Sequence, residues 1–188
     1  MATQSARGLV ICVTGPESSG KTSLAIELAR ILEVPLVAEV ARAYLTERRG
    51  AAGRFEQGYD RDDVREIARR QVAAEHDALA TGAPVVVADT DLTVIQVWWE
   101  EKFGALDQST AEALLERSPR RYLLAWPDLP WEPDPLRESP GNREQLALRY
   151  REILRAGEFP FQEIRGRGDI RLNLAMTAVE RWQILRSG

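Results

Sequence analysis

The 188-residue sequence predicts an α/β fold: a doubly wound, five-stranded parallel sheet with helices on both faces. Short apolar segments alternate along the chain with longer amphipathic ones, as strands and helices do in such folds. Glycine, proline or charged residues bound the short segments. A chain of this length with 44% apolar residues can bury one core but is short for two. We therefore expect a single domain over residues 1–188, with residues 1–7 as an N-terminal tail.

Each element follows from its local pattern. Apolar runs predict strands at 9–13, 35–38, 84–88, 122–125 and 159–164. Apolar residues at helical spacing predict helices at 21–32, 40–49, 61–81, 92–102, 109–117, 142–156 and 169–186. Residues 48–63 and the proline-rich residues 126–144 predict exposed loops. Because helices separate the strands, the sheet should be parallel and covered on both faces.

Composition excludes several classes of function. With 29 acidic and 25 basic residues, the chain has no basic field for nucleic acid or a membrane surface. Cys12 is the one cysteine and His76 the one histidine, so disulfide frameworks, zinc sites and histidine-based triads are disfavoured. No apolar run approaches the roughly 20 residues of a membrane span. We expect a cytoplasmic protein, and the sequence gives no indication of its oligomeric state.

A phosphate-binding motif lies between the first predicted strand and helix. Residues 15–22, GPESSGKT, satisfy GxxxxGK[ST] in the strand-to-helix context that a P-loop requires. Such glycines let backbone N–H groups surround phosphate oxygens at a helix N-terminus. Among 25 basic residues only Lys21 and Lys102 are lysines, and a slim ammonium suits the β- and γ-phosphates better than a broad guanidinium. The predicted nucleotide-binding residues are Gly15, Glu17, Ser18, Ser19, Gly20, Lys21, Thr22 and Ser23.

Two features predict a magnesium site. The Thr22 hydroxyl ends the P-loop motif, where it can reach Mg²⁺. Asp89 ends the apolar run at 84–88, and a strand-end carboxylate beside a P-loop holds the metal or its water. Asp91 follows two residues later, and either it or Thr90 could instead cap the helix predicted from Leu92.

A small-molecule kinase fits these features better than a GTPase. No Asn-Lys-x-Asp motif for guanine follows the P-loop. Glu39 ends the second predicted strand, where it could accept a proton from a substrate hydroxyl, although it could equally be a helix N-terminal acid. Residues 130–159 combine a proline-rich stretch with an arginine-bearing helix, which predicts a lid. From this lid Arg137 could supply charge to the transferring phosphoryl group.

The ordered motifs GPESSGKTSL, EVARAY, DTD followed by tryptophans, and PDLPWEPDPLR resemble the ribosylnicotinamide kinase domain of NadR-type proteins. This resemblance runs from about Val10 to Trp182 and implies ATP and Mg²⁺ as cofactors. It implies transfer of the γ-phosphate of ATP to the 5′-hydroxyl of nicotinamide riboside, giving nicotinamide mononucleotide. We expect the kinase domain alone, without the adenylyltransferase and helix-turn-helix domains of multidomain versions.

The resemblance also implies substrate-binding residues, and aromatic faces with carboxylates would suit the cationic nicotinamide ring. The implied residues are Glu39, Arg42, Tyr44, Asp91, Trp98 and Asp134. Trp98 and Trp99 point about 100° apart on a helix, so at least one should pack in the core. The catalytic candidates are Lys21, Arg137 and, as the base, either Asp91, which the motif favours, or Glu39. A kinase of another nucleoside or metabolite and a regulatory ATPase module remain alternative functions.

Overall fold

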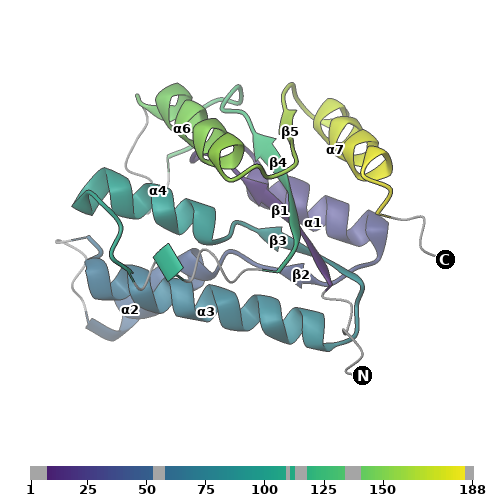
Figure 1. Ribbon diagram of the computed structural model, residues 1–188. Coiled ribbons are helices and arrows are strands. Elements are labelled where there is room, and N and C mark those ends of the chain that lie inside the picture. The colour runs from purple at the N-terminus through teal and green to yellow at the C-terminus, as the bar shows by residue number, and fades with distance from the viewer. Residues whose placement is uncertain (1–7, 53–57, 109–110, 113–117, 134–140, 185–188) are drawn as a thin grey trace.

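The computed structural model describes residues 8–52, 58–108, 111–112, 118–133 and 141–184. Five strands form one sheet in which every neighbouring pair is parallel, in the order β2-β3-β1-β4-β5 (Figure 1). The strands are β1 (Leu9–Thr14), β2 (Leu36–Val37), β3 (Val85–Asp89), β4 (Arg120–Ala125) and β5 (Phe161–Ile164). The predicted five-stranded parallel fold is confirmed.

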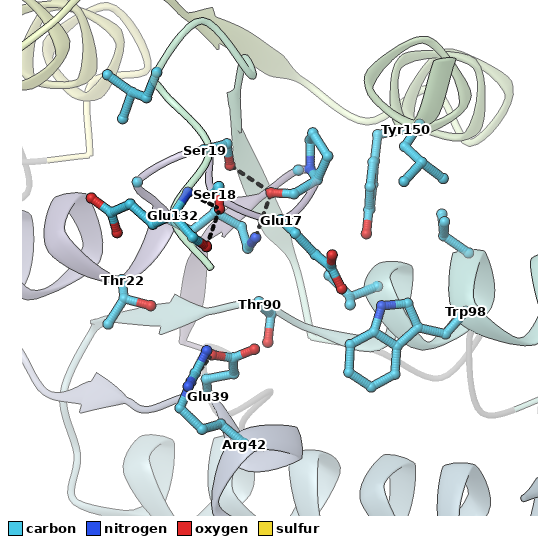
Figure 2. Close-up of a pocket in the computed structure, with 18 of the residues that line it drawn as sticks. Glu17, Ser18, Ser19, Thr22, Glu39, Arg42, Thr90, Trp98, Glu132 and Tyr150 are labelled. Atoms are coloured by element: carbon cyan, nitrogen blue, oxygen red, sulfur yellow. Dashed lines mark hydrogen bonds and ion pairs between the residues drawn. The ribbon is translucent and has the colours of Figure 1, made fainter. Parts of the chain in front are cut away.

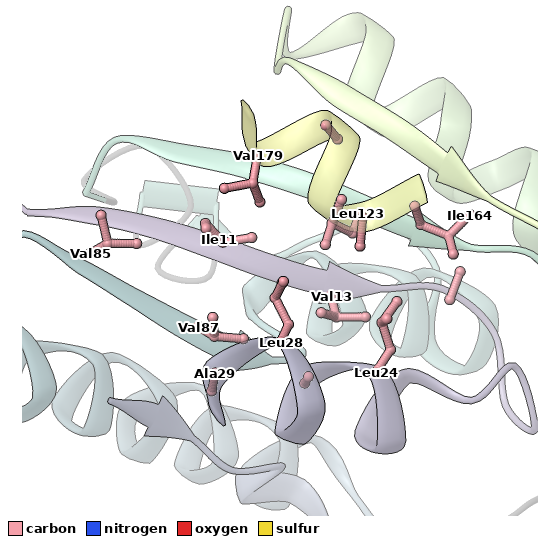
Figure 3. Close-up of a cluster of buried hydrophobic side chains, with 14 residues drawn as sticks. Ile11, Val13, Leu24, Leu28, Ala29, Val85, Val87, Leu123, Ile164 and Val179 are labelled. Carbon is pink, nitrogen blue, oxygen red and sulfur yellow. The ribbon is translucent and has the colours of Figure 1, made fainter. Parts of the chain in front are cut away.

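Alternate residues of the central strands pack against opposite helical layers. Ile11 and Val13 of β1 face helices α1 (Lys21–Leu32) and α7 (Asp169–Arg181), in the cluster that Figure 3 shows. Val10 and Cys12 face the other side. There the sheet is covered by α3 (Arg61–Ala80), α4 (Leu92–Phe103) and α6 (Arg143–Ala156), and α2 (Val40–Ala52) packs on α3. Burial on both faces explains why these strands are continuous apolar runs.

Most predicted boundaries agree with the structure, and the differences have local causes. Helix α2 continues through Gly50 to Ala52, so the first part of the predicted loop at 48–63 is helical. Helix α3 begins sharply after Asp60, which exchanges capping hydrogen bonds of 2.9 Å with Asp63. Helix α7 ends at Arg181, earlier than predicted. The tail at residues 1–7 and most of the helix predicted at 109–117 lie outside the described residues.

Helix α6 belongs to the core. Its residues Tyr150 and Leu154 are buried against the sheet with Val10 and Cys12 of β1. A helix that buries its apolar face against a sheet cannot swing as a unit without exposing that face. The lid over residues 130–159 stays a prediction, and residues 134–140 of it lie outside the described residues.

No helix in the described parts of the chain is long and apolar enough to span a lipid bilayer.

Candidate active site

The phosphate-binding loop follows central strand β1 and leads into α1. Gly15 has φ 136°, and a Cβ there would lie 2.5 Å from the carbonyl oxygen of Ala125 on β4. Gly20, the residue before α1, has φ 74°. Both conformations favour glycine, and at Gly15 the close approach of β4 also excludes a side chain. The two glycines of the motif thus give the loop its curvature at the carboxyl edge of the sheet.

Side chains of the loop close it internally. The Lys21 ammonium donates to the carbonyl oxygen of Pro16 at 2.7 Å, and the Ser19 hydroxyl donates to the same oxygen at 2.7 Å (Figure 2). Lys21 is therefore already folded over the loop, on the side where phosphates bind in this motif. Ser18, with φ 51°, exchanges 3.3 Å hydrogen bonds with the backbone of Glu132.

Two arginines from distant helices hold the carbonyl side of the loop. The guanidinium of Arg171, on α7, donates to the Ser19 carbonyl at 2.6 Å and to Asp128 at 2.7 Å. Arg143, at the start of α6, donates to the carbonyls of Ser18 at 3.3 Å and Leu129 at 3.0 Å. Burial lowers the pKa of Arg171, and Asp128 partly opposes this effect. With carbonyl oxygens bonded to these arginines, the N–H groups of the loop are left for an anion.

We expect Arg171→Met to weaken binding of a non-hydrolysable ATP analogue about tenfold, because one charge-assisted hydrogen bond that orders the loop is lost. Titration calorimetry of the analogue measures this without any acceptor substrate. Arg155→Met, a matched change at an exposed position of α6, is the control and should leave the Kd unchanged. Equal Kd values for both variants would show that Arg171 does not order the loop.

Asp89 ends β3 beside the P-loop, and its side chain fits a metal site. Both carboxylate oxygens are buried, and within the described residues neither makes a hydrogen bond that meets the usual geometry. Burial raises the pKa of Asp89. The nearby Thr22 hydroxyl, Lys21 and Arg42 oppose this shift, and Glu39 adds to it. Mg²⁺ would satisfy a buried carboxylate of this kind, which lies near a hydroxyl and within the described residues accepts no hydrogen bond of good geometry. Thr22 and Asp89 together are the residues that would hold the ion.

A cavity of about 540 Å³ extends from the P-loop to helices α2 and α4. Three residues implied by the resemblance line it, namely Glu39, Arg42 and Trp98, and Figure 2 shows them together with Thr90. Arg42 pairs with Glu39 at 3.1 Å. Residues 15–23 form one end of the cavity, so every predicted nucleotide-binding residue lies at its wall. The volume is in the usual range of small-molecule sites.

Several residues of the cavity wall were not predicted from the sequence. They include Tyr59, Thr90, Glu101, Lys102 and Tyr150. Thr90 adopts φ 73°, rare for a β-branched residue, and its carbonyl accepts from Gln71 at 3.3 Å. One available signal was the composition, because both lysines of the chain, Lys21 and Lys102, line this single cavity.

Asp91 is not among the residues that line the cavity, so the structure does not bring this predicted base and substrate ligand together with Glu39 and Trp98. Its buried carboxylate accepts from Arg120 at 2.8 Å, from the Tyr122 hydroxyl at 2.7 Å and from the Thr93 N–H at 2.8 Å. Burial disfavours charge on Arg120, but Asp91, Tyr122 and Glu75 outweigh burial and raise its pKa. The alternative interpretation of Asp91, as the cap of the following helix, is the one that the structure bears out.

Tyr44 also lies away from the cavity wall. Its hydroxyl donates to Asp63 at 2.7 Å, and the Arg70 guanidinium lies 4.9 Å from its ring centre. Trp99 is buried, and its indole N–H donates to Ala105 at 3.0 Å, so of the two adjacent tryptophans Trp99 belongs to the core. Asp134 and Arg137 lie outside the described residues, and their predicted roles stay predictions.

This sheet order, with a phosphate-binding loop after the central strand and an acidic residue at the end of the neighbouring strand, defines the P-loop kinase fold. The chain matches the AAA domain family over residues 10–171 and belongs to that family. A search of curated proteins found no match.

Solved structures with this fold include two of NadR proteins. A NadR protein in complex with NR has a TM-score of 0.72 and 20% identity, over 94% of this chain and 52% of its own. A NadR protein in complex with NAD and AMP-PNP has a TM-score of 0.74 and 21% identity, over 95% of this chain and 50% of its own. Thymidylate kinase from Ehrlichia chaffeensis has a TM-score of 0.60 and 15% identity, over 95% of this chain and 99% of its own. The chain thus spans about half of the NadR structures and nearly all of the thymidylate kinase.

Proposed function

We propose that this protein is an ATP-dependent kinase that phosphorylates the 5′-hydroxyl of nicotinamide riboside to give nicotinamide mononucleotide. The observation that carries the proposal is the cavity that joins the P-loop to Glu39 and Trp98 in one space. A kinase needs its phosphate donor and acceptor in such a shared site, because transfer depends chiefly on positioning the two. The NadR structure that holds NR supports this choice of acceptor.

The residues at the wall divide into donor and acceptor groups. Lys21 and the N–H groups of the loop bind the β- and γ-phosphates. Bound at Thr22 and Asp89, Mg²⁺ would supply positive charge to the phosphate oxygens. Trp98, whose ring stacks on that of Tyr59, provides an aromatic face for the base of the acceptor. The Lys21 ammonium now donates to the Pro16 carbonyl oxygen. To bind a phosphate instead, only its flexible side chain has to move.

Glu39 is our proposed base, in place of Asp91. It lines the cavity, is partly buried, and is held by Arg42 at 3.1 Å. The 5′-oxygen of the acceptor attacks the γ-phosphorus, the bond from that phosphorus to the β,γ-bridging oxygen breaks, and ADP leaves. The hydroxyl proton passes to Glu39 and then to solvent. Asp91 is the poorer candidate, because its carboxylate already accepts hydrogen bonds from Arg120, Tyr122 and the Thr93 N–H.

A coupled assay of ADP release with a panel of acceptors tests the proposal. We expect kcat/KM for nicotinamide riboside to exceed that for uridine, cytidine and adenosine by about tenfold or more, equal to about 1.4 kcal/mol in transition-state binding. A neutral nucleoside preferred by tenfold would refute this acceptor and leave a kinase of another nucleoside. ATP hydrolysis with no phosphorylated product from any acceptor would favour the regulatory ATPase.

A further inference from the structure

The acceptor end of the cavity carries a cation that no assigned role uses. The C-terminal half of α4 supplies the wall residues Trp98, Glu101 and Lys102, and Tyr59 comes from the segment before α3. The rings of Tyr59 and Trp98 stack with centres 5.4 Å apart and planes 24° apart. The Lys102 ammonium lies 3.7 Å from the centre of the Tyr59 ring. This aromatic pair therefore already has a cation of the protein against it.

Charges at this end of the cavity are arranged in pairs. Glu39 and Arg42 form an ion pair with each other. Glu101 and Lys102 are adjacent on α4, and both line the cavity. Neighbouring helix positions point about 100° apart, so Glu101 and Lys102 border the cavity at different points of its wall. A ligand that carries only positive charge gains from Glu101 but meets like charge at Lys102.

A pyridinium ring with a carboxylate matches both members of this pair. Its ring nitrogen is positive in the riboside, and its carboxylate is negative. The ring therefore carries one charge of each sign, as the pair Glu101 and Lys102 does. A carboxylate can accept a charge-assisted hydrogen bond from the Lys102 ammonium, which is stronger than the bond a neutral carboxamide can accept. Complementary charges of this kind set specificity, because a ligand that lacks one of the charges leaves a charged side chain of the cavity wall without its counterpart.

We propose that Lys102 makes this protein a kinase of the acid form of the substrate, nicotinate riboside, with its ring carboxylate at Lys102. The inference rests on the proposed function and adds pyridinium carboxylate ribosides, as the preferred acceptors, to a class that includes nicotinamide riboside. The reaction is the same transfer: the γ-phosphoryl group moves from ATP to the 5′-oxygen, and ADP, the 5′-phosphate and a proton result.

The test compares kcat/KM for nicotinate riboside with kcat/KM for nicotinamide riboside in three proteins. In the wild type we expect the ratio to favour the acid by about threefold to tenfold. In Lys102→Gln the ratio should fall about tenfold, because the amide keeps the length and polarity of the side chain but removes its charge. In Lys102→Arg the ratio should remain within about threefold of wild type. Lys102 is exposed, so these variants should fold normally.

Each outcome decides between the two proposals. A ratio unchanged in Lys102→Gln, or a wild-type enzyme that uses only the amide, overturns the assignment of Lys102 and leaves the proposed function standing. Use of neutral nucleosides with neither pyridine riboside overturns the proposed function itself. Arg155→Gln is the control for net charge, because it removes one positive charge from an exposed site on α6. Any change in its kcat/KM ratio measures the effect of net charge alone.

Discussion

Lys21→Ala should reduce phosphoryl transfer by at least about a hundredfold, the scale of losing one preorganised charge contact to the transition state. Lys21 is the P-loop lysine of this chain, and in the structure its ammonium already lies on the Pro16 carbonyl, within the loop. Alanine removes that charge without altering the glycines that shape the backbone. Steady-state ADP release with saturating acceptor measures the loss.

Arg30→Ala is the matched control for this variant. Arg30 is an exposed cation in the last turn of the same helix, so its removal changes net charge equally and leaves the loop intact. We expect it to keep wild-type turnover. Thermal unfolding of both variants should resemble wild type. Turnover of Lys21→Ala near the wild-type rate would remove Lys21 from the catalytic residues.

The donor end of the site could be predicted from the sequence because its residues, 15–23, are contiguous in the chain. The loop conformation depends on glycines at fixed positions between a strand and a helix, and both glycines have the left-handed or strained φ values that glycine permits. Only their close neighbours, Ala125 and Leu129, required the tertiary structure. The strand assignments also depended on local apolar runs, and their parallel pairing followed from the intervening helices.

The acceptor end could not be predicted in the same way because its residues are brought together by packing. Tyr59 precedes α3 while Trp98 and Lys102 lie on α4, and it is the contact between those helices that stacks the two rings. Tyr44 matched a motif but turns toward Asp63 on α3, a partner that is distant in sequence. No local pattern indicates which face of α2 will meet α3.

The place of α6 in the core was not evident from the sequence for a related reason. The amphipathic pattern correctly indicated a packed face, and Tyr150, Ile153 and Leu154 are buried. What the pattern does not specify is the surface on which the face packs. Here it is the sheet itself, so α6 is part of the core, and its arginines form ion pairs such as Arg149 with Glu100 at 2.7 Å and Arg151 with Glu163 at 2.6 Å.

Asp89 and Asp91 were hard to distinguish because both follow the same strand, two residues apart. In a continuous strand they would point to one side. Thr90 breaks the strand with φ 73°, and Asp91 then turns toward Arg120 on β4 instead of the cavity. Arg120 lies almost 30 residues further along the chain, so its role as partner was not evident from the sequence.

The two aspartates should therefore respond differently to the same change to asparagine. In Asp89→Asn we expect activity to fall by about a hundredfold or more with a weakened dependence on Mg²⁺, because the amide is a poor ligand for a hard cation. In Asp91→Asn the new NH₂ group must face either Arg120 and Tyr122 or the Thr93 N–H, all of which now donate to the carboxylate. An unsatisfied buried group of this kind costs about 1–3 kcal/mol of unfolding free energy.

Denaturant unfolding without ligands should separate the two effects. Burial raises the folded-state pKa of Asp89, so above that pKa its charge destabilises the fold and Asp89→Asn should be at least as stable as wild type. This advantage should shrink as pH falls through the raised pKa toward the ordinary aspartate value, because the folded wild type then binds its proton. Asp91→Asn should be less stable at neutral pH, yet keep near wild-type Mg²⁺ dependence in its folded fraction. If Asp91→Asn lost its Mg²⁺ dependence while Asp89→Asn kept it, the metal site would have to be assigned to Asp91.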